Sequence, residues 1–178
     1  MNYNSFVSKL TSIAPTPNDF LKHGVCNEYA LAASENFIAK SKQLVNGTPL
    51  DNPGLIDLIL NFECNKIQIG LVSFLRNVEE TQGYYFVGNV EADILAISKI
   101  SFEIVVLDHE DKEWVIWPCA QNSSKFFDAI LEFATYLSIK IKNSSTLDAD
   151  LESQYISICT QKAGGEKYKA FYEMLIAG

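Results

Sequence analysis

Side chains that build many catalytic centres are scarce in this sequence. Only two histidines occur among its 178 residues, His23 and His109. A nucleophile activated by histidine, or a metal site built on imidazole, would have to use one of these two. The motifs GxSxG, HExxH, GxGxxG and GxxxxGK followed by Ser or Thr do not occur. The sequence therefore gives no direct sign of hydrolase, metalloprotease or nucleotide-binding chemistry.

Cysteine is also used sparingly. The four cysteines are Cys26, Cys64, Cys119 and Cys159. They lie far apart and form no CxxC pair, which excludes a zinc knuckle and a thioredoxin-type motif. We expect them to be small buried apolar side chains or reduced bystanders.

Basic clusters and long apolar runs are missing as well. Lysine and arginine number 14 against 22 aspartates and glutamates, and the formal net charge is -8. This balance disfavours nucleic acid and anionic membrane and favours a basic protein partner, although an acidic excess is also common in ordinary cytosolic proteins. No stretch approaches the ~18 consecutive apolar residues of a membrane span, and the amino terminus lacks the features of a secretory signal. We expect a cytoplasmic protein.

What the sequence does contain is enough apolar material for one packed domain over residues 1–178. Hydrophobic residues make up 48% and charged residues 20% of the chain, as in an ordinary globular protein. Phe6, Val7 and Leu10 share one helical face, and "APTPNDFLKHG" favours a short helical turn that Gly24 can end. Residues 30–37 indicate a helix or an irregular segment. Residues 46–54 are rich in turn residues and predict a loop or a hairpin tip.

The middle of the chain has the pattern of an antiparallel meander. Apolar, β-branched and aromatic segments recur about every ten residues, with turn residues between them. An acidic loop with Glu79, Glu80 and Gly83 is expected after the first segment. The segments cover residues 66–76, 84–88, 93–98, 102–108 and 113–117.

The period then changes to that of helices. Residues 123–142 carry a stripe of apolar side chains at helical spacing, with Asn122 or Ser123 available as the N-cap. Beyond a polar linker, residues 151–163 and 166–177 predict two more amphipathic helices, separated by a break at "AGGEK". The fold class predicted is therefore α+β: a largely antiparallel mixed sheet of about five to six strands, helices packed on it and extra C-terminal helices.

The stretch "VVLDHEDKEWVIW", residues 105–117, is the place where a histidine and several carboxylates stand closest together. In a strand, Asp108 and Glu110 would point one way and His109 and Asp111 the other, so they would not converge on one metal. A loop could still bring them together, which leaves a small metal enzyme built on His109 with Asp108 or Glu110 as an alternative. A solvated hairpin turn explains the same residues. We interpret the stretch as two strands and their turn, and expect no enzymatic activity, metal or cofactor.

Aromatic residues are concentrated on or beside the expected strands. Trp114 and Trp117 are three residues apart in an extended segment and should point to opposite faces, so one of them is expected outside the core. Tyrosine and tryptophan are favoured anchors of protein interfaces, and an acidic rim would steer a basic partner toward them.

The order of these parts resembles that of the SUKH superfamily of bacterial immunity proteins, whose relatives include the fungal cell-wall synthesis regulator. The resemblance covers residues 17–142. It is carried by "PTPNDFLKHGV", "YYFVGNVEADILAIS", "FEIVVLDHEDKEWVIWP" and "NSSKFFDAILEFATYL". The early "NGG"-type segment of many members appears here only as "VNGTP", and the "GLP"-like turn as "HGVCNE", which leaves the subfamily open. Residues 151–176 would be an extension beyond the SUKH-like part.

The resemblance implies an α+β fold and an antitoxin that binds and blocks a polymorphic toxin, such as a nuclease, with no catalytic residues to transfer. The alternative from another functional class is a regulatory or scaffolding module that binds endogenous proteins or peptides. Charge and position at strand edges select the candidate contact residues for a basic toxin: Glu79, Glu80, Tyr84, Glu91, Asp108, Glu110, Asp111 and Trp114.

Overall fold

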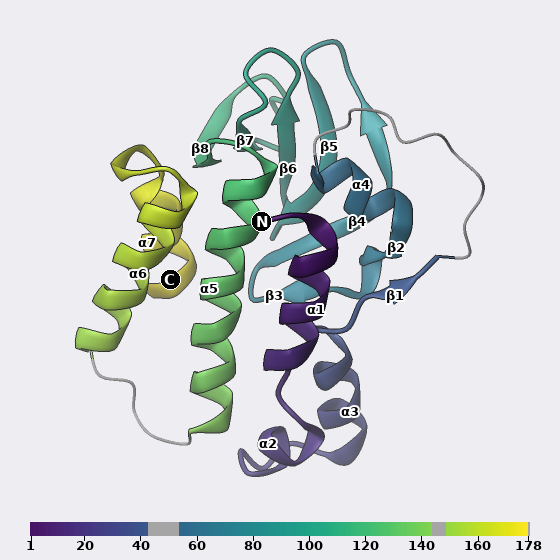
Figure 1. The fold of residues 1–178 in the computed structure, drawn as a ribbon, viewed down its shortest axis with the longest axis vertical. Helices are drawn as coiled ribbons and strands as arrows, with labels where there is room; N and C mark the ends of the chain where they lie inside the picture. The colour runs from purple at the N-terminus through teal and green to yellow at the C-terminus, as the bar shows by residue number, and fades with distance from the viewer. Residues whose placement is uncertain (43–53, 144–148, 178) are drawn as a thin grey trace.

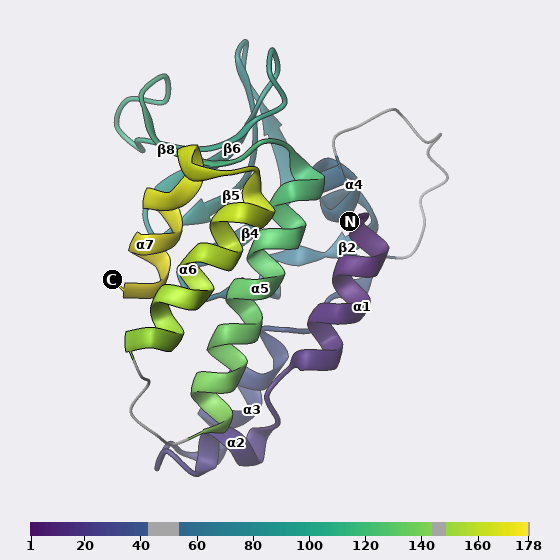
Figure 2. The same ribbon diagram turned by 60° about the vertical axis from the view of Figure 1, so that its left-hand side comes forward.

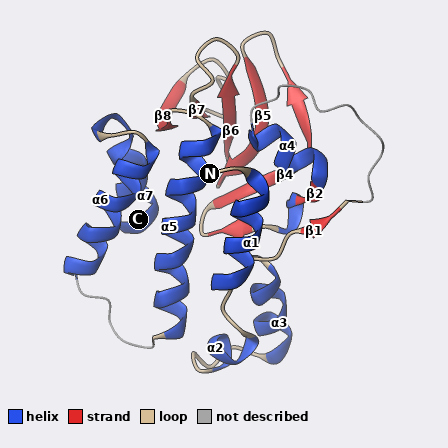
Figure 3. Cartoon of the chain, in the orientation of Figure 1, coloured by secondary structure: helices blue, strands red, loops and turns tan. Residues whose placement is uncertain are grey.

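The computed structural model describes residues 1–42, 54–143 and 149–177 and has an α+β fold, as predicted. A six-stranded antiparallel sheet and a two-stranded sheet lie against a group of helices (Figure 3). The helices are α1 (Tyr3–Ile13), α2 (Pro17–Leu21), α3 (Asn27–Glu35), α4 (Gly54–Asn61), α5 (Ser123–Lys142), α6 (Ala149–Ala163) and α7 (Lys169–Ala177), with short 3-10 turns η1 (Cys64–Lys66) and η2 (Glu166–Tyr168). The strands are β1 (Lys40–Ser41), β2 (Phe62–Glu63), β3 (Gln68–Ile69), β4 (Val72–Glu80), β5 (Tyr84–Val90), β6 (Asp93–Ser98), β7 (Ile104–Leu107) and β8 (Val115–Ala120).

The N-terminal helices form as their local sequence predicts. The Asn2 side chain caps α1, and Phe6 and Leu10 are fully buried on its inner face. Proline 17 opens α2, and Gly24, in the left-handed region at φ 77°, ends the turn that follows it. Residues 30–37, where a helix or an irregular segment was expected, are mostly helical and belong to α3 up to Glu35.

One helix, α4, was not predicted. Leu55, Ile56, Leu58 and Ile59 are buried on one face of this helix, whereas Leu60 on the other side is 55% exposed. The expected loop or hairpin tip at residues 46–54 lies outside the described residues except for Gly54, which begins α4. The segment is short and mostly apolar, and periodicity alone does not distinguish a helix from a strand in so short a run.

The large sheet is a meander in chain order, from β3 to β8, in which every neighbouring pair is antiparallel. The expected first strand is divided by a turn at Gly70 into β3 and β4. Glu79 and Glu80 are the last residues of β4 and not part of a loop, which corrects the expectation. The register between β4 and β5 shifts between Phe74 and Glu79, so four residues of β4 lie opposite Val87 alone.

Both faces of the central strands are buried. In β7, Ile104 and Val106 belong to the main core under the helices, whereas Val105 and Leu107 belong to a small cluster on the outer face. Successive strand residues alternate between faces, so the continuous apolar run IVVL fits a strand that is covered on both sides.

Helix α5 lies at the centre of the helical layer, between α1 and α6 (Figures 1 and 2). Asn122 caps it by accepting a hydrogen bond from the Lys125 N–H at 3.0 Å, as predicted. Phe127 stacks on Phe6 of α1 with the ring centroids 4.8 Å apart. The sequence pattern of α5 therefore corresponds to the face that closes the main core.

The C-terminal helices share this core. Tyr172 of α7 is buried, and its hydroxyl donates to the Cys119 carbonyl oxygen at 3.1 Å. The Gln121 N–H donates to the Ala163 carbonyl oxygen at 2.9 Å, joining the end of β8 to the end of α6. Three cysteines are buried as expected, but Cys26 is exposed. Across the described ranges, no helix has the length and apolar character needed to cross a membrane.

Candidate functional site

The stretch that raised the question of chemistry is a hairpin, as interpreted from the sequence. Strands β7 and β8 pair antiparallel, and residues 108–114 form the loop that joins them. The Asp108 N–H donates to the Trp114 carbonyl oxygen at 3.0 Å, which closes the loop at its base. We call these seven residues the β7–β8 loop.

Two aspartates organise the backbone of this loop. Oδ1 of Asp108 accepts hydrogen bonds from the N–H groups of Glu110, at 2.7 Å, and Asp111, at 3.3 Å. Because these bonds favour the carboxylate, they lower the pKa of Asp108. Oδ1 of Asp111 accepts from the Glu113 N–H at 3.2 Å. Two acidic residues of the run thus have a structural reason to be there.

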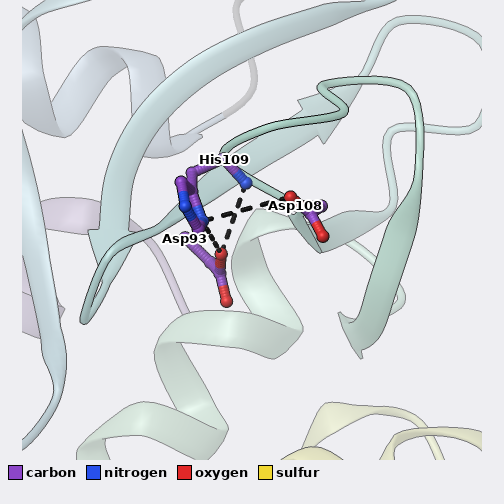
Figure 4. Close-up of side chains that lie close together, drawn as sticks. All are labelled: Asp93, Asp108 and His109. Atoms are coloured by element: carbon purple, nitrogen blue, oxygen red, sulfur yellow. Dashed lines mark hydrogen bonds and ion pairs between the residues drawn. The ribbon is translucent and has the colours of Figure 1, made fainter.

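A third aspartate, which the sequence did not single out, joins this loop to the neighbouring hairpin (Figure 4). Oδ1 of Asp93, at the start of β6, lies 2.9 Å from Nδ1 of His109 and accepts from the His109 backbone N–H at 3.3 Å. Nδ1 of His109 is also 4.0 Å from Oδ1 of Asp108. The hydrogen bond that Asp93 accepts from the ring raises the pKa of His109, and the charges of Asp93 and Asp108 act in the same direction.

Strand β7 ends at Leu107, so Asp108 and His109 belong to the loop, and the loop brings them together as the sequence left possible. Asp93 was missed because it is 16 residues from His109 in the chain. The only signal for it was the register of the meander, which places the β5–β6 and β7–β8 turns at the same end of the sheet.

The cluster of Asp93, Asp108 and His109 has the donor set of a divalent-cation site, with ligand atoms all within 4.8 Å of one another. The His109 side chain is 54% exposed, however, and its Nδ1 already has Asp93 as a hydrogen-bond partner at 2.9 Å. Water therefore reaches all three groups and weakens their electrostatic effects. The cluster is better explained as a contact that joins the ends of two hairpins than as a catalytic pocket.

Trp114 is the most conspicuous side chain of the β7–β8 loop. It is 66% exposed, whereas Trp117, three residues on, is partly buried against the main core. The prediction that one tryptophan lies outside the core is confirmed. Burial in its own fold does not explain the position of Trp114, because most of its surface contacts water.

Charge at this end of the sheet is strongly acidic. Six carboxylates here stand against one lysine and one histidine, and Lys112 Nζ lies 5.7 Å from the Phe86 ring centroid. Glu91, in the adjacent β5–β6 turn, has a left-handed φ of 54°. The six carboxylates belong to Glu91, Asp93, Asp108, Glu110, Asp111 and Glu113.

The remaining candidates lie at the opposite end of the strands. Glu79, Glu80 and Tyr84 flank the β4–β5 turn, and Tyr84 pairs with Ser98 at the end of β6. Six steps along β5 correspond to about 20 Å. The eight candidate contact residues therefore form two groups and not one surface.

The two ends differ in how their charges are used. Glu80 forms an ion pair with Lys99 from the neighbouring hairpin, and Tyr84 packs partly against the small outer cluster. This end also exposes Ile100 and Phe102 in the β6–β7 turn. It is thus an apolar tip with its acidic charge partly neutralised, while the β7–β8 end keeps an excess of carboxylates beside an exposed tryptophan.

Compared with known proteins, the chain matches no family model, no curated protein and no solved structure. The resemblance to the SUKH superfamily consequently remains an expectation from sequence pattern.

Proposed function

We propose that the chain is an immunity protein of the SUKH type, which binds and neutralises a toxin with a basic surface. The observation that carries this proposal is Trp114, 66% exposed in a loop whose carboxylates outnumber its cations. An aromatic side chain inside an acidic rim has the composition of an interface hot spot for a basic partner. The protein acts by binding the toxin and not by catalysis, in the cytoplasm where the toxin is synthesised.

The binding surface is the β7–β8 end of the sheet: Glu91, Asp108, Glu110, Asp111 and Trp114. A standard interface buries about 800 Å² on each partner, so these residues form its centre and neighbouring loops its rim. The acidic excess steers the encounter, and Trp114 supplies apolar contact. Bound there, the protein covers the positively charged active surface that a nuclease uses to hold nucleic acid.

Rigidity of the loop supports the same proposal. Backbone N–H groups of the loop donate to Asp108 and Asp111, and the Asp93–His109 pair joins the loop to the next hairpin, so the loop backbone is restrained before any partner binds. A preorganised loop loses less conformational entropy on binding.

The test is co-expression with the product of the neighbouring gene in the native genome. If that product is toxic, the wild-type chain should restore growth and the triple variant Glu110→Gln, Asp111→Asn and Trp114→Ala should not. Circular dichroism of the purified variant checks that it remains folded. The matched control, Glu79→Gln, Glu80→Gln and Ile100→Ala, removes the same charge and one apolar side chain at the opposite end and should still protect.

Protection by the triple variant and its loss in the control would place the contact at the other end of the sheet. A neighbouring gene that is harmless, together with no protection against any linked toxin, would instead favour the regulatory or scaffolding module.

A further inference from the structure

A concave site lies away from the sheet, between the C-terminal helices. Helix α6 forms one wall, and η2 with the start of α7 forms the other, around a cleft of about 330 Å³. That volume is at the lower end of the range for small-molecule sites. None of the residues proposed for toxin binding lines it.

The polar groups of the cleft are mainly acceptors with negative charge. Glu152 comes from α6, Glu166 from η2 and Glu173 from α7, whereas Lys169 is the one cation among the lining residues. Lys169 lies 3.5 Å from Glu173 and is paired with it. The cleft therefore has a net negative charge, which disfavours phosphates and other anions.

One wall of the cleft is positioned by the core beneath it. The buried Tyr136 of α5 donates its hydroxyl hydrogen to Oε1 of Glu152 at 3.2 Å. Burial, together with the charge of Glu152, raises the pKa of Tyr136 to about 12, so the phenol stays a donor at neutral pH. Glu152 is thus held in place with its second oxygen available.

The independent sign of a ligand is Thr160, which lines the cleft and is only 2% exposed. Its hydroxyl Oγ1 has no hydrogen-bond partner among the described residues. A buried hydroxyl without a partner is costly, and this oxygen is enclosed by protein in the present rotamer. Threonine in a helix has a second common rotamer, so the hydroxyl must rotate to accept a hydrogen bond from a donor in the cleft.

The spacing of the carboxylates indicates the shape of the ligand. In the described ranges, the only group of ligand-type side chains with atoms within 4.8 Å of one another is Asp93, Asp108 and His109. The three glutamates of the cleft do not form such a group, so their arrangement does not favour a single metal ion. Ile156 offers an apolar surface between them.

We infer that the α6–α7 cleft binds an elongated organic cation, with ammonium or guanidinium groups on an aliphatic stem. The cationic groups pair with the separate carboxylates, the methylene stem lies on Ile156, and an N–H donates to Thr160. Free linear polyamines and the basic side chains of a peptide segment share this chemistry. The inference goes beyond the proposed function and does not depend on it.

The test measures binding to the purified full chain by calorimetry at low salt, with two ligands of equal charge. Spermidine represents free polyamines, and a tri-lysine peptide blocked at both ends represents basic side chains. Tighter binding of spermidine would identify a free polyamine as the ligand, and tighter binding of the peptide would identify basic side chains. Either result supports the cleft if the variants behave as follows.

The double variant Glu166→Gln, Glu173→Gln should weaken binding about three- to ten-fold. The control Glu35→Gln, Glu63→Gln removes the same charge from exposed positions elsewhere and should change affinity less than about two-fold. Thr160→Val should leave the melting temperature equal or higher, because it removes an unpaired buried hydroxyl, and yet weaken binding.

Equal weakening by the two charge variants would show attraction to net charge alone and overturn the site. Failure of both ligands to bind wild-type protein would do the same. Neither result bears on toxin neutralisation, which is measured with a different partner and other variants.

Discussion

Replacing Trp114 by alanine is the sharpest test of the proposed binding surface. The side chain is 66% exposed in the free protein and lies in the β7–β8 loop, outside both apolar clusters. The substitution should therefore leave folding nearly unchanged, within about 0.5 kcal/mol of the wild-type stability. Any large effect on toxin binding then reports on the interface.

The expected size of the effect follows from the exposed area. If a tryptophan side chain buries roughly 250 Å² at most, the exposed 66% corresponds to about 165 Å², which is worth ~4 kcal/mol at ~25 cal/mol per Å². Ordering the tryptophan side chain on binding costs about 1 kcal/mol of this gain, and the alanine side chain retains a small part of the contact. We expect a loss of about 2–3 kcal/mol, or a Kd raised about 30- to 150-fold.

The assay is titration calorimetry or surface-based kinetics with purified toxin at fixed salt concentration. Ile100→Ala is the matched control, since Ile100 is 91% exposed but lies in the β6–β7 turn at the other end of the sheet. Its Kd should stay within about two-fold of wild type.

A Trp114→Ala variant that binds as tightly as wild type would refute the assignment of this surface. If Ile100→Ala weakened binding instead, the partner would dock on the apolar tip formed by the β4–β5 and β6–β7 turns.

Other predictions concern charge, pH and packing. Association with a basic toxin should slow by at least about ten-fold when salt is raised from about 50 to about 500 mM, because screening removes the steering; equal rates would contradict it. The raised pKa of His109 implies that its bond to Asp93 stabilises the fold fully below the unfolded-state pKa near 6.5 and less as pH rises through the folded-state value, so Asp93→Asn should lower urea midpoints more at about pH 6 than at about pH 9. Gly88→Ala should cost about 1–3 kcal/mol in urea unfolding, because a Cβ would lie 2.2 Å from a β4 carbonyl oxygen, whereas Gly83→Ala, with no atom within 4 Å, should be nearly neutral. Tyr172→Phe should cost about 1 kcal/mol by removing the hydrogen bond from α7 to β8; no change in its melting temperature would mean that the C-terminal helices dock without this bond.

Local sequence patterns determined much of this fold. The apolar stripe of α5, its Asn122 cap and the period-two strands depend on residues a few positions apart, so sequence spacing was sufficient to predict them. The different environments of Trp114 and Trp117 were also predicted, although Trp114 lies in the β7–β8 loop and not in the strand that the alternation rule assumed.

Tertiary structure alone decided which distant residues meet. Asp93 contacts His109 because the register of three strands brings two turns together. Glu80 forms an ion pair because Lys99 lies at the same end of the sheet. Helix α4 is too short and apolar for periodicity to distinguish it from a strand, and the α6–α7 cleft exists only once the two helices pack. Pairings between residues far apart in the chain depend on strand register and helix packing, which local periodicity does not specify.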